Sequence, residues 1–92
     1  NNIASSGNDK TSILVSIINK SGSLSKLLKP LAEKRITMTK IESIPTKINN
    51  WEYMFVIDIK GHKDDEKVMK VLTQMNKNSV FFKVLGSYPL NE

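Results

Sequence analysis

Residues 51–60 read WEYMFVIDIK, and large apolar side chains occupy every second position of this stretch. A two-residue period sustained along the whole segment predicts a β-strand with one covered face. The covered face would carry Trp51, Tyr53, Phe55, Ile57 and Ile59. We expect these side chains to lie in a core or at an interface rather than to stack on a ligand.

A strand and a helix are predicted upstream of this segment. Residues 12–18 are β-branched and nearly all apolar, which is typical of a strand covered on at least one face. After a polar turn an apolar stripe follows at helical spacing, with Ser21 or Ser23 as the expected cap. Its members are Leu24, Leu27, Leu28, Leu31 and Ala32. We expect the helix to continue, bent, past Pro30, because the stripe continues beyond the proline.

The remaining elements complete an alternating order. Residues 36–43 predict a strand, and the acidic residues 64–66 mark the start of a second helix that reaches Lys77. The apolar stripe of that helix is Val68, Val71, Leu72 and Met75. Residues 81–88 predict the last strand, in which Gly86 indicates a bulge or a close backbone approach.

The order βαββαβ predicts an α+β, ferredoxin-like sandwich in which two helices cover one face of a four-stranded antiparallel sheet. Its other face would be partly bare, and apolar residues there would mark an oligomer interface or a ligand surface. We expect residues 1–11 to form a linker or leader, residues 12–90 the domain and residues 91–92 a tail. The chain of 92 residues has room for one domain only.

The amino-acid composition limits the classes of molecule that this chain is expected to bind. The net charge of +5 suggests nucleic acid, but the basic residues are scattered lysines with Arg35 as the one arginine. We therefore favour a solvated surface and expect no nucleic-acid partner, with a ferredoxin-like nucleic-acid module kept as an alternative. No apolar run is long enough to span a membrane. The chain holds no cysteine and begins without signal-peptide features, so we expect a cytoplasmic location.

Side chains for catalysis are scarce. The single histidine, His62, stands in a glycine turn without a nucleophile partner, so we expect a solvated or capping role. The carboxylates of residues 64–66 are expected to complement the helix dipole rather than to hold a metal. We expect neither a catalytic site nor a metal or cofactor in this chain.

A small-molecule site is conceivable in residues 19–24, where a strand leads through a turn into a helix. Free N–H groups at a helix start favour a carboxylate, Gly22 allows close approach, and Asn19 offers a carbonyl oxygen to an ammonium group. Such a turn suits an amino acid. Many turns of this type bind nothing, so this pattern alone leaves the function open.

Five segments together carry a family resemblance that covers about residues 11–90. They are residues 19–24 (NKSGSL), 39–45 (TKIESIP), 51–53 (WEY) with Phe55 and Asp58, 61–62 (GH) and 82–89 (FKVLGSYP). In order and spacing they resemble the C-terminal ACT regulatory domain of prephenate dehydratase, which in many bacteria is fused to chorismate mutase. The resemblance implies a non-catalytic regulatory fragment of a lyase in phenylalanine biosynthesis.

In this family L-phenylalanine binds between two ACT domains and inhibits the catalytic domain. The resemblance therefore implies a homodimer, or a tetramer in the full-length enzyme, with the catalytic prephenate dehydratase domain as a further partner. Its glycine turn maps to Asn19, Ser21, Gly22, Ser23 and Leu24. Its second motif, contributed by the neighbouring subunit, maps to Glu42, Ser43, Ile44 and Pro45.

Three positions depart from the family pattern. Ser21 stands where the family usually has proline, Ser23 where it has alanine, and Ile44 where it has arginine. The first two changes keep room for a ligand, whereas the third removes a guanidinium group from the centre of the second motif. An alternative function is therefore a dimerisation or assembly module whose ligand site is degraded.

Overall fold

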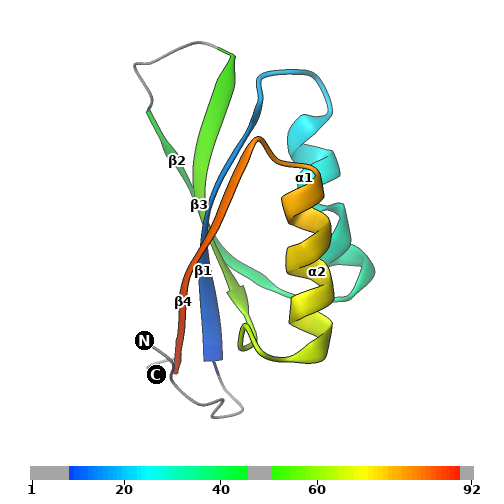
Figure 1. The fold of residues 1–92 in the computed structure, drawn as a ribbon, viewed down its shortest axis with the longest axis vertical. Coiled ribbons are helices and arrows are strands. Elements are labelled where there is room, and N and C mark those ends of the chain that lie inside the picture. Colours follow the sequence, from blue (N-terminus) through cyan, green and yellow to red (C-terminus); the bar gives the residue numbers. More distant parts are fainter. Residues whose placement is uncertain (1–8, 46–50, 90–92) are drawn as a thin grey trace.

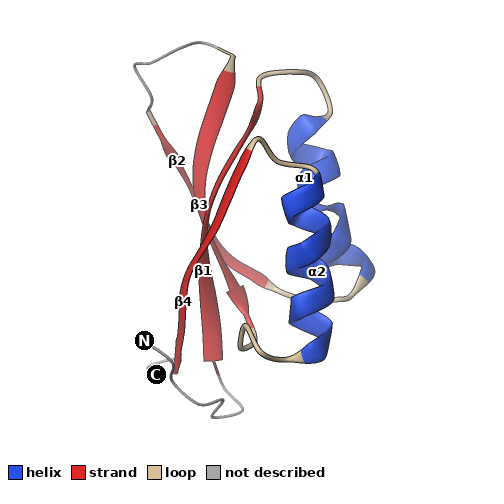
Figure 2. Cartoon of the chain, viewed as in Figure 1, coloured by secondary structure: helices blue, strands red, loops and turns tan. Residues whose placement is uncertain are grey.

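The computed structural model describes residues 9–45 and 51–89 (Figure 1). The elements in chain order are β1 (Asp9–Ile18), α1 (Ser23–Glu33), β2 (Met38–Ile44), β3 (Glu52–Lys60), α2 (Glu66–Lys77) and β4 (Phe81–Pro89). The strands form one sheet in the order β2-β3-β1-β4, and every neighbouring pair is antiparallel. Both helices lie on the same side of the sheet (Figure 2), so the predicted ferredoxin-like βαββαβ fold is confirmed.

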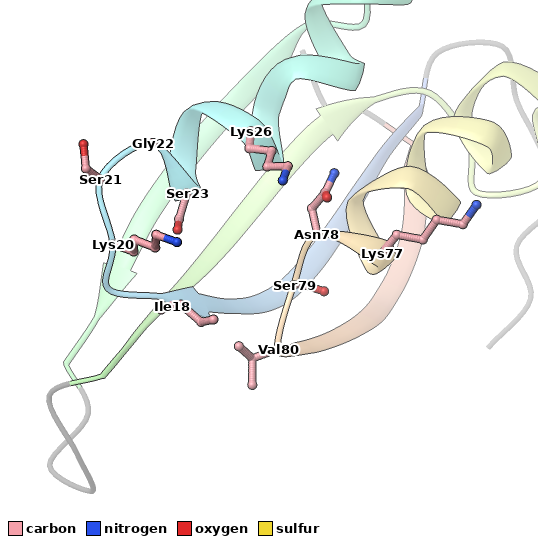
Figure 3. Close-up of a pocket in the computed structure, with 10 residues that line it drawn as sticks. All are labelled: Ile18, Lys20, Ser21, Gly22, Ser23, Lys26, Lys77, Asn78, Ser79 and Val80. Atoms are coloured by element: carbon pink, nitrogen blue, oxygen red, sulfur yellow. The ribbon is translucent and has the colours of Figure 1, made fainter.

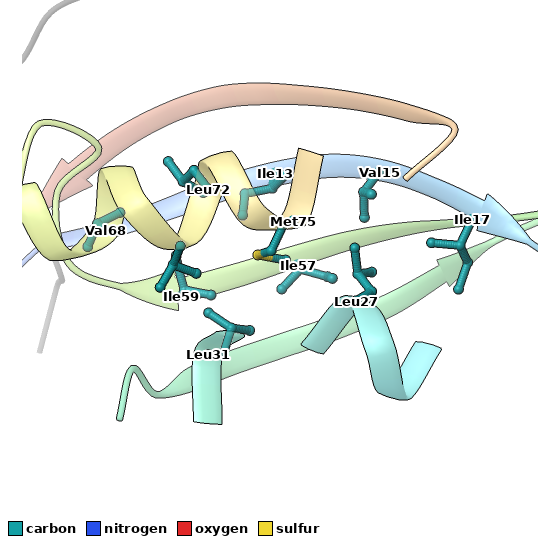
Figure 4. Close-up of a cluster of buried hydrophobic side chains, with 11 residues drawn as sticks. Ile13, Val15, Ile17, Leu27, Leu31, Ile57, Ile59, Val68, Leu72 and Met75 are labelled. Carbon is teal, nitrogen blue, oxygen red and sulfur yellow. The ribbon is translucent and has the colours of Figure 1, made fainter. Parts of the chain in front are cut away.

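The core lies between this sheet and the two helices (Figure 4). It is made of apolar side chains from β1, β3 and both helices, namely Ile13, Val15, Ile17, Leu27, Leu31, Ile57, Ile59, Val68, Val71, Leu72 and Met75. The predicted stripe of α2 is buried completely, whereas in α1 Leu27 and Leu31 are buried and Ala32 is exposed. Pro30 lies inside α1, so the helix continues past the proline as expected, and Pro30 itself is buried.

The first strand begins at Asp9, three residues earlier than expected. The added residues at the start of β1 are polar and form hydrogen bonds with neighbouring segments. The hydropathy pattern could not predict these bonds. The carbonyl of Asp9 accepts a hydrogen bond from Gly61 N at 2.8 Å. The hydroxyl of Thr11 donates to Gly61 O at 2.7 Å, and Ser87 therefore donates to Thr11, also at 2.7 Å. The other residues of the expected leader, 1–8, lie outside the described part of the chain.

The helix-free face of the sheet carries a polar network on β1, β3 and β4, beside half-buried apolar side chains that include Leu14, Met54 and Val56. The hydroxyl of Ser12 donates to Asp58 Oδ1 at 2.6 Å and accepts a hydrogen bond from the hydroxyl of Tyr88. Lys10 completes the network, with its ammonium group 3.4 Å from Asp58 Oδ2 and 5.3 Å from the centre of the Tyr88 ring. Because Ser12 and Asp58 are both buried, this network fixes the register of three strands.

The backbone conformation explains why glycine stands at two positions, Gly61 and Gly86. The β1–β4 register shifts between Ser12 and Ile13, opposite Gly86 and Val84, so the bulge predicted at Gly86 is confirmed. Gly61 has a φ of 118° at the turn that follows β3, a conformation that side chains rarely adopt.

His62 lies in the same turn and is 1% exposed, so of the two expected roles, solvated or capping, the solvated one does not apply. Its capping role is seen instead, because its Nδ1 accepts a hydrogen bond from the backbone N–H of Asp64 at 3.1 Å. Asp65 closes the turn by accepting a hydrogen bond from His62 N at 3.1 Å. The acidic residues thus order the start of α2, with Glu66 in its first turn.

Candidate functional site

The turn between β1 and α1 is held by its backbone. Asn19 N donates to the carbonyl of Trp51, which ties the turn to the start of β3. Ser23 N donates to Lys20 O at 3.1 Å, and Gly22 O accepts the first helical hydrogen bond, from Lys26 N, at 2.9 Å. The turn is therefore preorganised by bonds that do not require a ligand.

The cap of α1 differs from the prediction. Gly22, not Ser21 or Ser23, is the N-cap, and no side chain caps the helix. Gly22 has a φ of 86°, in the left-handed region that favours glycine. A serine that caps a helix with its side chain usually has an extended backbone, so this conformation explains the difference. A Cβ atom on Gly22 would meet nothing within 4 Å, so the space beside this backbone is open.

Most of the predicted glycine-turn residues are accessible. Asn19, Ser21, Gly22 and Leu24 are exposed, and Ser23 is half-buried. Leu24 belongs to the apolar stripe by sequence yet remains 37% exposed, because it begins the helix beyond the part of α1 that packs on the sheet. The structure thus leaves an apolar side chain beside an accessible backbone turn.

The second predicted motif lies on the edge strand β2 and just after it. Glu42 is paired with Val56 and Ile44 with Met54 across the β2–β3 ladder. By alternation their side chains lie on the helix-free face, as does that of Asp58, whereas Ser43 faces the other way. Glu42 is exposed and forms an ion pair with Lys40 at 3.4 Å, Ile44 is half-buried, and Pro45 is exposed.

Within one chain the two motifs do not meet. Strand β3 lies between β1 and β2, so residues 42–45 are separated from the turn at residues 19–24 by a full strand. A cavity of about 400 Å³ does adjoin the turn (Figure 3), but no residue of the second motif lines it. It is lined by Ile18, Lys20, Ser21, Gly22, Ser23, Lys26, Lys77, Asn78, Ser79 and Val80.

Of the residues that line this cavity, sequence reasoning had singled out only Ser21, Gly22 and Ser23. The segment from Lys77 to Val80 connects α2 to β4, and it reaches the turn because Val80 N donates to Ser16 O at 2.8 Å. The sequence offered one indirect signal, since the predicted topology places the β1–α1 and α2–β4 connections at the same end of the sheet. No pattern of residue types marked the segment itself.

The aromatic residues at this end of β3 are exposed rather than buried in the core. Trp51 is 74% and Tyr53 49% exposed, whereas Phe55 is half-buried against the core. Tyr53 and Phe55 make an edge-to-face contact with ring centroids 6.4 Å apart. The predicted alternation is right, but β3 extends past the helices (Figure 1), so none of the described residues buries the side chains at its start.

Within residues 9–45 and 51–89, no three histidine, aspartate or glutamate side chains lie close enough to hold a metal ion. Neither helix of the described part is long and apolar enough to cross a membrane. What the described residues do offer is an accessible backbone turn with an adjoining cavity.

Comparison with known proteins gives a consistent match. The ACT domain model matches residues 11–76. The bifunctional chorismate mutase/prephenate dehydratase of Neisseria gonorrhoeae is 48% identical over 84 residues, which are 91% of this chain and 23% of that protein. The prephenate dehydratase of Mycolicibacterium smegmatis is 34% identical over 83 residues, 90% of this chain and 27% of that protein.

A solved structure agrees with the sequence matches. Prephenate dehydratase from Arthrobacter aurescens, crystallised in complex with L-Phe, superposes with a TM-score of 0.87 and 31% identity over 96% of this chain and 29% of that one. The chain spans about a quarter of the length of the curated relatives that it matches.

Proposed function

This chain belongs to the ACT domain family, and we propose that it is a regulatory domain of a prephenate dehydratase that binds L-phenylalanine between two copies of itself. The ligand would inhibit a catalytic domain that lies outside these residues, in a protein with or without a chorismate mutase domain. The observation that carries the proposal is the open backbone at Gly22, in a fold that superposes on a relative crystallised with L-Phe.

The chemistry of the turn supports an amino-acid ligand. The first turn of α1 has no side-chain cap, and Gly22 leaves its backbone accessible to a carboxylate. Leu24 and the exposed aromatic residues at the start of β3 provide apolar surface at the same end of the sheet. An apolar side chain next to a carboxylate acceptor is the combination that phenylalanine requires.

The need for a second copy follows from the separation of the motifs. Residues 42–45 lie on the edge strand β2, where they are open to another molecule, and they cannot reach residues 19–24 of their own chain across β3. A partner that presents its β2 edge to the turn would complete the site. The exposed side chains of Ile41, Trp51 and Tyr53 would then become covered.

Regulation would follow from the position of the ligand at such an interface. A ligand that contacts two subunits stabilises the arrangement of the pair that binds it better, by its differential affinity for the two arrangements. Allosteric couplings of this kind are typically about 1–3 kcal/mol. The residues before β1 would carry the change to the catalytic domain.

Calorimetric titration of the chain with L-phenylalanine tests the proposal, with glycine as the control that lacks the aromatic ring. We expect heat with millimolar phenylalanine and none with glycine, together with a shift toward the dimer in sedimentation. Absence of heat with phenylalanine, or equal heat with both amino acids, would refute the proposed ligand.

The Ile44→Arg variant distinguishes this proposal from the alternative, an assembly module that binds no ligand. The variant restores the arginine that is usual in the family. If the native site is degraded, the variant gains phenylalanine binding while sedimentation of the ligand-free protein is unchanged. If the native site is intact, the native chain binds phenylalanine before any substitution.

A further inference from the structure

A patch of apolar side chains lies on the helix-free face of the sheet, toward the end at which β1 leads into the turn before α1. By alternation with the core residues, Leu14 of β1, Met54 and Val56 of β3 and Phe81 of β4 point to this face. The first three are half-buried, and Phe81 is 44% exposed. Both helices lie on the opposite side of the sheet (Figure 2), so no described helix covers these four residues, which we call the back patch.

The ladder registers place the back patch between two opposite charges. Leu14 is paired with Lys83 of β4 on one side and with Val56 of β3 on the other. Val56 is in turn paired with Glu42 of β2. All four side chains point to the helix-free face, because directly paired residues share a face. They therefore form one row across the sheet, with a cation at one end, a carboxylate at the other and two apolar side chains between them.

Both charges at the ends of this row are open to another molecule. Glu42 is exposed, and its ion pair with Lys40, at 3.4 Å, is a surface pair of the kind that contributes little to stability. Lys83 is exposed and forms no ion pair within residues 9–45 and 51–89. A second molecule that presents the same row in the reverse order would bring opposite charges together at both ends.

The neighbouring row adds a matching shape to this charge pattern. Ser16 of β1 is paired with Phe81 of β4 and with Met54 of β3, so a small side chain stands between two large ones. An aromatic ring and a methionine thioether attract each other, and here they lie on opposite sides of β1. Reversal of this row would place the ring of one copy over the thioether of the other.

A two-fold axis parallel to β1 reverses both rows at once. It places β3 of each copy over β4 of the other, so that Phe81 meets Met54 of the second copy and Leu14 meets Leu14 of the second copy. The same rotation brings Lys83 to the side on which Glu42 of the second copy lies. The face is therefore complementary to itself, as an isologous contact requires. Sheets packed face to face in this aligned way lie about 10 Å apart.

We propose that two copies of this domain pack face to face through the back patch. The contact does not depend on the proposed function, and the two are compatible. Because β3 separates β2 from β1, strand β2 extends beyond the second copy when the axis runs along β1. The open edge of β2 and the turn at residues 19–24 thus stay accessible for phenylalanine. A chain that uses both contacts would form a tetramer.

The polar network limits this contact to one end of the sheet. On the same axis Lys10 would face Lys10 of the second copy, and like charges directly opposite each other repel. Strands of sheets packed in this way cross at about 30°, so the two copies diverge with distance from the back patch. The divergence keeps the two lysines apart and leaves the hydrogen bonds of Ser12 and Asp58 within each copy.

Sedimentation equilibrium over a series of protein concentrations tests the contact, without ligand and with saturating L-phenylalanine. We expect the ligand-free chain to pass from monomer to dimer as its concentration rises. Phe81→Lys places a charge in the back patch and should raise the dissociation constant by more than about tenfold. Lys83→Glu leaves the apolar side chains intact and should weaken the dimer by about two- to fivefold, and the added Glu42→Lys substitution should restore it.

The matched control is Met69→Lys, which introduces the same charge at a similarly exposed apolar position, 52% exposed on α2 and so on the other side of the sheet. We expect it to change the dissociation constant by less than about twofold.

Three results would overturn the contact. They are a ligand-free chain that stays monomeric up to about 1 mM, a loss with Met69→Lys as large as with Phe81→Lys, and a charge swap that fails to restore the dimer. A ligand-free dimer in a chain that binds no phenylalanine would contradict the proposed function and support this contact. A chain that is monomeric alone and dimeric only with phenylalanine would do the reverse.

Discussion

Gly61 packs against Val68 so closely that a Cβ atom on Gly61 would lie 2.6 Å from Cγ2 of Val68. Since Gly61 also has a φ of 118°, the Gly61→Ala variant suffers both backbone strain and a clash with the core. We expect it to lower the free energy of unfolding by about 2–4 kcal/mol, measured by urea denaturation. In a Val68→Ala background the clash is absent, so the cost of Gly61→Ala should fall; strictly additive costs would contradict the contact.

Gly22 gives a different prediction, because a Cβ atom there meets nothing within 4 Å. Its φ of 86° still disfavours alanine, so we expect Gly22→Ala to cost about 1–2 kcal/mol of stability. Phenylalanine affinity, measured by calorimetry on the folded variant, should fall by more than about tenfold because the added methyl group occupies the ligand's approach. Unchanged affinity in the folded variant would remove Gly22 from the site.

Two buried serines on β1 form a matched pair. Ser12 bonds to both Asp58 and Tyr88, whereas the hydroxyl of Ser16 has no partner among the described residues. We expect Ser12→Ala to cost about 1–3 kcal/mol, because it leaves buried polar groups unsatisfied, and Ser16→Ala to cost less than about 0.5 kcal/mol or to stabilise the protein. Chemical denaturation of both variants checks this, and equal costs would refute the network.

Two methionines of α2 provide a second pair. Met75 is fully buried, while Met69 is 52% exposed on the same helix. We expect Met75→Ala to lower the free energy of unfolding by about 2–5 kcal/mol and Met69→Ala by less than about 0.5 kcal/mol, in thermal or urea unfolding. A large loss at Met69 would mean that this side chain is covered in solution, which sedimentation of the variant would detect.

The sequence predicted the element order and most of the core because both depend on local periodicity. Ile57 and Ile59 are buried as the alternation of β3 requires, but Trp51 and Tyr53 on the same face are exposed. Periodicity indicates which face a residue belongs to and contains no information about how far the helices extend along the strand. The burial of His62 was likewise hidden, because it results from contacts that the turn creates.

The candidate site was likewise predicted only in part from the sequence. Gly22 and its neighbours were found from a local strand–turn–helix pattern, and the structure places them in an accessible turn. The cavity beside them was not found, because it needs Lys77 and Asn78 from a connection more than fifty residues away. Charge counts gave only the net +5 of the whole chain and could not show which lysines line this cavity.

The double pairing of β1 limits how this domain can respond to any ligand. Strand β1 is hydrogen-bonded to β3 from Lys10 to Ile18 and to β4 from Asp9 to Ser16, so it cannot slide without breaking two ladders at once. A ligand that displaced the turn after Ile18 should therefore move β1 as a rigid strand, so that Asp9 at its other end moves with it. The amides of Ile13 and Val15 should accordingly exchange with solvent only on global unfolding, with or without ligand.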